Sequence, residues 1–341
     1  MAVPKKVAIV LAGAVAKGAF EAGAIQALSE AANIEIVRIV ASSSGALNGT
    51  VLAGAIRSGT LQQGAATLVS LWNERAEWYE VFDLSLVDLL KRDGVSSQRK
   101  LVQLLRSFVT PTADDAVTSP IQLRLIVAPI DGTPGMIGDR AATTYESIQT
   151  FDGEAFDSAQ GLEQVFAAAT ASTAFPLLFA PVSLPGLGPC VDGGLVNNTP
   201  IKWALDGAVG ADVEAIVVVS SSVALRTKPA ENTHGTALIG HLADMLIGER
   251  LFRDLREATT SNAQIDRLAN LVHSGVLSSE QLGAVFEALA WDSRRRVEVV
   301  EIRPTEALHG SAFSGFFDAR LRKDHIAAGL ARGRDVLRAF D

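Results

Sequence analysis

The chain has 341 residues, of which 48% are hydrophobic and 20% charged, so it can bury a large core without help from disulfides or structural metals. Its 38 Asp and Glu residues outnumber 30 Lys and Arg, and a net charge of −8 repels phosphate backbones, which excludes nucleic acid as an expected partner. With one cysteine, Cys190, and no run near the ~20 apolar residues of a membrane-spanning helix, the chain is expected to be cytoplasmic and at most peripheral at a membrane surface.

The first elements of the chain read as two strand-to-helix units. Residues 1–16 are similar to a signal peptide, with two lysines, an apolar run at 7–11 and small residues after it. The run instead continues into helical periodicity at 20–28, so we interpret it as a strand followed by a loop and a helix. A second apolar run at 34–40 leads into helical periodicity at 46–56. Two such units predict a parallel sheet covered by helices.

Further strands are expected at 121–127, 143–150, 215–220 and 297–302, each an apolar or β-branched segment bounded by turn residues. The interval 225–295 shows helical periodicity without a convincing strand, so we predict a helical insertion over the core and a candidate lid. Its apolar stripe either packs into the core, the commoner arrangement, or contacts acyl chains or a membrane surface; the stripe is Leu238, Ile239, Leu242, Met245, Leu246 and Ile247. We therefore predict one domain over 1–341, a three-layer α/β/α fold with a mostly parallel central sheet plus this insertion.

Ser43 stands between a predicted strand and a predicted helix, in the sequence Ala41-Ser42-Ser43-Ser44-Gly45. A nucleophile elbow places its serine at such a turn, where small neighbours let strand and helix pack closely. The helix N-terminus and the N–H of Ser44 would then point at a developing oxyanion. A serine that only caps the helix gives the same local pattern, and this segment alone does not decide between the two.

Two glycine-containing segments accompany Ser43. Upstream, residues 13–18 read GAVAKG and lie between the first strand and its helix, where successive backbone N–H groups can line an anion site. This is neither a Walker A loop nor a dinucleotide fingerprint, because Lys17 precedes Gly18 and the second glycine of G-x-G-x-x-G is missing. Downstream, residues 192–194 read DGG, a carboxylate before a tight turn, which by itself is most often only a turn.

In this order the three segments resemble the patatin-like phospholipase family, which carries G-G-G-x-[RK]-G, G-x-S-x-G and D-G-[GA]. The first appears here as GAVAKG at 13–18, the second as ASSSG at 41–45, and the third is intact at 192–194. Ala168–Pro176 is similar to the small-residue helix before the family's aspartate strand, and Phe313–Leu337 is similar to its closing helix. The resemblance spans nearly the whole chain apart from the helical insertion.

The resemblance implies an acyl hydrolase, without metal or other cofactor, that cleaves fatty-acyl esters of phospholipids, lysophospholipids or glycerolipids. Ser43 would be the nucleophile and Asp192 the general base, and an acyl-enzyme would form and then be cleaved by water. The implied oxyanion hole comprises the backbone N–H groups of Gly13, Ala14, Val15 and Ser44, and the implied supporting residues are Lys17, Gly18, Gly45, Gly193 and Gly194. Because the reference pKa of aspartate, ~3.9, is low for a base, we expect Asp192 to be buried and so more basic.

The chain departs from the family pattern at a few positions. Ala14 and Val15 stand where glycines are usual, and valine disfavours positive φ, so we expect ordinary backbone angles or a reshaped loop there. Ala41 adds a methyl group at the strand–helix contact. Two alternatives stay open: an acyltransferase with a serine elbow and a histidine base, and a non-catalytic lipid-binding protein whose oxyanion loop has drifted. None of the five histidines lies in a catalytic or metal-binding motif, and His325, among charged neighbours, is expected at the surface.

Overall fold

The computed structural model describes residues 3–83, 96–113, 118–176, 178–205, 213–223, 235–289, 291 and 295–340, without the side chains of 235–244, 246 and 247. Within these residues the central sheet has the strand order β10-β9-β1-β2-β3-β8-β7, and β6 also pairs with β3. Its strands are β1 (Lys5–Leu11), β2 (Ile34–Ala41), β3 (Gln122–Pro129), β6 (Ser147–Asp152), β7 (Val182–Leu184), β8 (Gly188–Asp192), β9 (Ala215–Val219) and β10 (Glu298–Ile302). The path from β10 to β3 is parallel, whereas β6, β7 and β8 add antiparallel pairings at one side.

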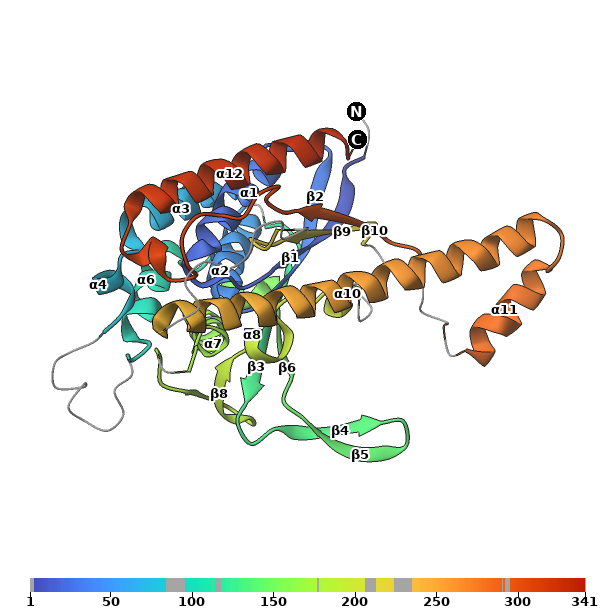
Figure 1. The fold of residues 1–341 in the computed structure, drawn as a ribbon, viewed down its shortest axis with the longest axis horizontal. Coiled ribbons are helices and arrows are strands. Elements are labelled where there is room, and N and C mark those ends of the chain that lie inside the picture. Colours follow the sequence, from blue (N-terminus) through green and yellow to red (C-terminus); the bar gives the residue numbers. More distant parts are fainter. Residues whose placement is uncertain are drawn as a thin grey trace.

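Helices cover both faces of this sheet (Figure 1). The α-helices are α1 (Gly18–Glu30), α2 (Ser44–Arg57), α3 (Leu61–Ser70), α4 (Trp78–Val81), α6 (Arg99–Phe108), α7 (Ala159–Ser172), α8 (Gly194–Asn197), α9 (Lys202–Leu205), α10 (Gly235–His273), α11 (Ser279–Ala288) and α12 (Ala319–Arg338). Shorter turns are η1 (Val15–Lys17), η2 (Leu71–Arg75), η3 (Gly153–Phe156) and η5 (Ser314–Phe316). The larger core lies between the sheet and α1, α2, α3, α7 and α12, and a smaller core lies between the sheet and α9 with α10.

Strand β1 shows why the sequence folds into layers. Ile9 and Leu11 belong to the larger core, whereas Ala8 and Val10 belong to the smaller core on the opposite face, as the two-residue period of a strand requires. Both sets are fully buried, so the strand reads as a continuous apolar run, which is typical of a parallel strand covered on both faces. The predicted three-layer α/β/α fold with a mostly parallel sheet is confirmed.

The predicted strands at 7–11, 34–40, 121–127, 215–220 and 297–302 are confirmed, but the expected strand at 143–150 is wrong as a single element. Its first residues end β5 (Arg140–Thr144), which pairs only with β4 (Thr133–Ile137) in a separate hairpin. Its last residues form β6 in the central sheet. Glu146 lies at the break, where its carboxylate accepts hydrogen bonds from α8 and α9 instead of continuing a strand.

Helix α10 has 39 residues and projects beyond the body, with α11 folded back at its far end (Figure 1). Leu251 in its middle is buried in the smaller core, whereas α11 buries no residue. The described part of 225–295 therefore contains helices and no strand. Of its apolar stripe only the side chain of Met245 is described, and it is exposed; the other members lie outside the described side chains. No described helix is both long enough and apolar enough to cross a bilayer.

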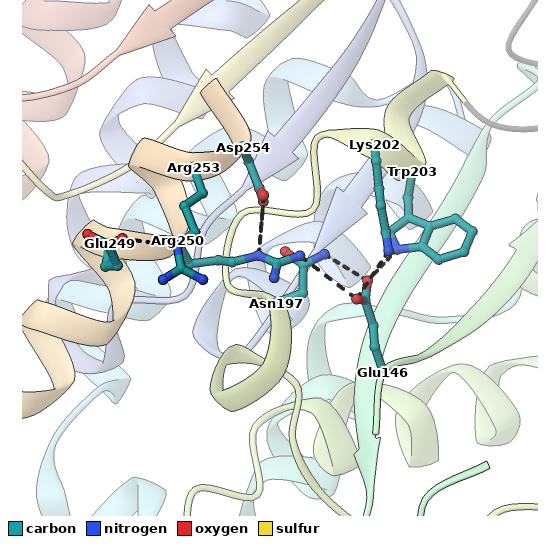
Figure 2. Close-up of polar contacts among 8 residues, drawn as sticks. All are labelled: Glu146, Asn197, Lys202, Trp203, Glu249, Arg250, Arg253 and Asp254. Atoms are coloured by element: carbon teal, nitrogen blue, oxygen red, sulfur yellow. Dashed lines mark hydrogen bonds and ion pairs between the residues drawn. The ribbon is translucent and has the colours of Figure 1, made fainter. Parts of the chain in front are cut away.

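A polar cluster attaches α10 to the body (Figure 2). The carboxylate of Glu146 accepts hydrogen bonds from Asn197, Lys202 and Trp203 and lies 3.9 Å from the guanidinium of Arg250 on α10. Burial opposes the charge on Glu146, but hydrogen bonds from Trp203 and Asn197 and the nearby lysine outweigh it and lower the pKa of Glu146. The cluster joins α10 to α8, the short helix that follows Asp192.

Candidate functional site

Ser43 occupies a strained turn between β2 and α2, with φ 54° and ψ −133°. Such a conformation costs a non-glycine residue about 1–3 kcal/mol and persists only where the surroundings fix it. Here the N–H of Ser43 donates to Ser172 Oγ over 3.1 Å, and the backbone of Gly45 packs so closely on β1 that an added Cβ would lie 2.5 Å from Leu11 O. The Ser43 side chain makes no capping hydrogen bond to α2, so the structure does not support the capping interpretation.

The Ser43 hydroxyl instead faces Asp192 at the end of β8. Ser43 Oγ donates to Asp192 Oδ2 over 2.7 Å, and Asp192 Oδ1 accepts from the N–H of Gly194 over 2.7 Å. The aspartate is 2% exposed. Burial raises its pKa to about 7, although the hydrogen bonds from Ser43 and Gly194 oppose the shift. The fold thus brings together a serine and a basic carboxylate from segments 149 residues apart.

The loop after β1 lies directly against Ser43. A Cβ added to Gly13 would lie 2.2 Å from Ser43 Cβ, so only glycine fits there without displacement. Val15 has φ 53°. Of the two alternatives expected for this loop, ordinary backbone angles or a reshaped loop, the first is therefore wrong. The loop is fixed instead by its neighbours, because the N–H of Ala16 donates to Ala312 O and the N–H of Ala14 donates to Ser44 Oγ.

The N–H groups near Ser43 differ in their partners. The N–H of Ala14 is engaged by the Ser44 hydroxyl at 2.9 Å. Within the described part of the chain, the N–H groups of Gly13, Val15 and Ser44 have no hydrogen-bond partner. These three are therefore the free donors among the four backbone groups that the sequence assigned to an oxyanion hole.

The supporting residues also pack around this turn. Lys17 is buried at the end of η1, and a Cβ added to Gly18 would lie 2.7 Å from the Trp72 ring and 3.1 Å from Ser44 Oγ. Gly193 lies against β3, where an added Cβ would be 2.0 Å from Ile126 O. Gly18 and Gly193 therefore lie where an added Cβ would meet neighbouring atoms at short range.

Asn198 is a part of the site that the sequence analysis missed. This buried side chain donates from Nδ2 to Gly13 O over 2.9 Å, which fixes the orientation of the Gly13 carbonyl. Its Oδ1 would lie 2.7 Å from a Cβ at Gly13 and 2.6 Å from one at Gly194. Asn198 thus ties the loop after β1 to the turn after Asp192. The available signal was a run of polar residues at 197–199 directly after an aspartate turn.

We expect Asn198→Ala to lower kcat for the acyl-ester hydrolysis that the resemblance implies by about 10- to 100-fold, because the Gly13 carbonyl loses a buried hydrogen bond and the loop loses its orientation. Asn198→Asp keeps the shape but presents no donor to Gly13 O, and it is expected to be at least as damaging. Steady-state kinetics on a soluble ester, with KM little changed, would show this. Full activity in Asn198→Asp would mean that only packing matters at this position.

An apolar cavity that opens to solvent adjoins the Ser43–Asp192 pair. Its wall comes mainly from α2, α3, η2, α6 and the segments around α4 and α7, and includes Val15, Leu47, Val51, Leu68, Leu71, Trp72, Val81, Phe82, Leu101, Leu104, Leu105, Phe175, Leu178, Phe179 and Phe316. Such a wall suits a fatty-acyl chain. No described side chain of α10 or α11 lines it, so a lid role for 225–295 stays a prediction.

Asn48 is the main polar side chain in the cavity wall, and it is fully engaged behind it. Its Oδ1 accepts from Trp72 Nε1 over 2.8 Å, and its Nδ2 donates to Glu21 Oε2 over 2.8 Å. Burial raises the pKa of Glu21 well above its usual value, which favours the neutral carboxyl. The network therefore holds Trp72 in place without putting a charge beside the cavity.

The histidines with described side chains make no hydrogen bond to Ser43 or Asp192. His325 is buried, so the expectation of a surface position is wrong: α12 turns this side chain onto the preceding loop, where its Nε2 lies 3.0 Å from His309 O. Burial, with a contribution from Lys17, lowers the pKa of His325. Among the histidines whose side chains are described, none lines the cavity. No group of three or more His, Cys, Asp or Glu residues in the described chain could hold a metal ion.

The fold and the site define a three-layer α/β protein with a serine at a strand-to-helix turn, hydrogen-bonded to a buried aspartate beside an apolar cavity. The family profile described as Patatin-like phospholipase matches residues 9–205. The chain belongs to this family, and the membership supports a lipid-hydrolysing enzyme. No curated protein sequence matches the chain closely enough to count as a relative.

Two solved structures from bacteria are similar to the chain. VipD from Legionella pneumophila has 12% sequence identity and a TM-score of 0.40, over 99% of this chain and 67% of that one. The heterodimeric ExoU–SpcU complex from the type III secretion system of Pseudomonas aeruginosa has 17% identity and a TM-score of 0.31, over 85% of this chain and 60% of that one. The chain thus spans about two thirds or less of the length of either structure.

Proposed function

We propose that the protein hydrolyses fatty-acyl esters of phospholipids, lysophospholipids or related glycerolipids, with Ser43 as nucleophile and Asp192 as general base. The observation that carries the proposal is the 2.7 Å hydrogen bond from Ser43 Oγ to a buried Asp192. A general base must lie within hydrogen-bond reach of the proton that it takes, and its pKa works best near the operating pH. The apolar cavity beside the pair supports an acyl chain as the other half of the substrate.

The geometry supports a two-step reaction. Ser43 Oγ would attack the ester carbonyl carbon as its proton passes to Asp192 Oδ2, and the free N–H groups of Gly13, Val15 and Ser44 would donate hydrogen bonds to the oxyanion. When the tetrahedral intermediate collapses, the ester C–O bond breaks and Asp192 returns the proton to the leaving alcohol. Water then attacks the acyl-Ser43 ester with Asp192 as base, which releases the fatty acid and restores the serine.

The acyltransferase alternative requires a histidine base and an acceptor other than water. The partner of Ser43 in this structure is a carboxylate, and none of the histidines with described side chains lines the cavity. These observations favour hydrolysis by an aspartate base over acyl transfer by a histidine.

We expect kcat/KM to rise about tenfold per pH unit up to a bend near pH 7 and then to level off, because Asp192 must be ionised to accept the proton. The bend follows from burial, which raises the pKa of Asp192 to about 7. A pH profile measured on a soluble ester, with thermal unfolding followed over the same range, would separate titration of the base from loss of fold. Activity that continues unchanged down to pH 5 would contradict an aspartate base of this kind.

Release of free fatty acid from phosphatidylcholine, lysophosphatidylcholine and a chromogenic acyl ester tests the proposed function. Ser43→Ala is expected to abolish release. The control is Ser42→Ala, which changes the adjacent buried serine, whose hydroxyl has no hydrogen-bond partner among the described residues, and it is expected to retain release. Equal release by both variants would contradict the proposal. No release by the unaltered protein on any of the three substrates would favour the non-catalytic alternative.

A further inference from the structure

Aromatic rings form a continuous stack from the cavity wall to the protein surface. The rings of Phe179 and Phe82, both in the wall, stack with centroids 4.9 Å apart. Phe82 stacks on Trp78 at 3.9 Å, and Trp78 stacks on Phe317 at 5.0 Å. Phe316, next to Phe317, returns to the wall and meets Phe82 edge-on. The stack thus joins segments from three distant parts of the chain into one apolar path.

The outer end of this path is exposed. Phe317 is 69% exposed and Tyr79, next to Trp78, is 63% exposed, and we call Trp78, Tyr79 and Phe317 the aromatic rim. The rim belongs to α4 and the end of η5, at the left end of the molecule in Figure 1 and far from α11. The exposed ring of Phe317 stacks on Trp78, and contiguous apolar surface of this kind marks a contact surface more often than single exposed residues do.

The charged side chains beside the rim are engaged with the protein itself. The pairs are Arg75 with Glu80, Arg99 with Asp83, and Lys100 with the carbonyl oxygens of Tyr79 and Phe82. Charges of both signs are thus interspersed among the described side chains beside the rim. The face is therefore built for apolar contact with a surface of little net charge.

We propose that the aromatic rim inserts into the surface of a lipid bilayer, so that an acyl chain passes along the ring stack into the cavity. The inference rests on the proposed function, because a hydrolase of membrane lipids must move an acyl chain from the bilayer to Ser43. The stack is continuous with the cavity wall, and this continuity favours a bilayer as the occupant of this face. An acyl chain that moves from a bilayer along the stack to the cavity would avoid contact with water. Trp and Tyr also suit a membrane–water boundary, since each ring carries an apolar body and a polar group.

Co-sedimentation with phosphatidylcholine vesicles tests the proposal, with Ser43→Ala as the parent so that the lipid is not consumed. Adding Tyr79→Ser and Phe317→Ser is expected to weaken vesicle binding at least tenfold. The matched control adds Met136→Ser and Ile137→Ser on β4, where the side chains are 64% and 66% exposed, and it is expected to bind like the parent. Phe317→Trp keeps an apolar ring and is also expected to bind like the parent. Binding is expected to change less than twofold between 0.05 and about 0.5 M salt, since apolar contact is not screened by ions.

Several outcomes would overturn the proposal: equal binding by the rim variant, a loss confined to the β4 control, loss of binding in Phe317→Trp, or loss of binding in high salt. Thermal unfolding of each variant checks that the fold is kept. The parent could bind no vesicles while the unaltered protein hydrolyses a monomeric ester in a Ser43-dependent way. This result would contradict the bilayer contact but leave the proposed function supported. Rim-dependent vesicle binding without any ester hydrolysis would support the bilayer contact and contradict the proposed function.

Discussion

Asp192→Asn is expected to lower kcat/KM for acyl-ester hydrolysis by about 10³- to 10⁴-fold, because Ser43 then has no acceptor for its proton. Asparagine has nearly the same shape, and its amide oxygen can still accept from Gly194, so the turn should stay folded. In the structure the only side chain that Asp192 contacts by a hydrogen bond is Ser43, within the described residues. A measurement of initial rates on a soluble ester decides the size of the effect.

The same substitution is expected to stabilise the protein at neutral pH. Burial raises the pKa of Asp192 to about 7, so the folded state binds a proton that the unfolded state has released above its ordinary pKa of 3.8. The stability contribution of this carboxyl therefore falls as pH rises between these two values and stays low above them. Thermal unfolding should show a higher Tm for Asp192→Asn than for the unaltered protein at pH 8, with the difference shrinking towards pH 4.

A retained rate in Asp192→Asn, together with a lost rate in a histidine variant such as His325→Gln, would sink the Ser43–Asp192 pair. This result would favour the alternative of an acyltransferase with a histidine base. A Tm that does not change with the substitution would instead show that the pKa of Asp192 in the folded protein stays close to its ordinary value.

Gly13→Ala is the second large expected effect, a loss of about 10²- to 10³-fold in kcat with the fold retained. The added Cβ would lie 2.2 Å from Ser43 Cβ and 2.7 Å from Asn198 Oδ1, so the loop or the serine must shift. Either shift separates the nucleophile from the free N–H groups beside it. The measurement is kcat on a soluble ester, with circular dichroism to verify the fold.

Gly283→Ala on α11 provides the matched control, because an added Cβ there meets nothing within 4 Å. It is expected to leave kcat unchanged and to raise helix stability slightly. Gly13→Ala with full kcat would show that the loop after β1 plays no part in the chemistry.

The sequence predicted the layers of the fold for a simple physical reason, whereas the pairing of Ser43 with Asp192 was implied by the resemblance to the patatin-like family. Apolar runs that become helical within a few residues produce parallel strands, and a serine at such a junction faces the edge where strands end. Asp192 was identified from the order of the three family-like segments along the chain. Its own local pattern, Asp-Gly-Gly, indicates only a turn.

Other parts of the site depend on contacts that carry no period in the sequence. Asn198 reads as one polar residue among several, and its role follows only from packing between Gly13 and Gly194. The preference of valine for negative φ argues against the conformation of Val15. Val15 nevertheless adopts a positive φ because neighbouring hydrogen bonds fix the loop. The break at Glu146 likewise depends on hydrogen bonds to residues more than fifty positions away.

The most direct test of the central claim is to locate a covalent adduct after treatment of the folded protein with a fluorophosphonate. Mass spectrometry of the digested protein is expected to find one adduct, on the peptide that contains Ser43, absent from Ser43→Ala and present in Ser42→Ala. Labelling of Asp192→Asn is expected to be slower. A folded protein that carries no adduct, or carries it on another residue, would contradict the assignment of Ser43 as the nucleophile.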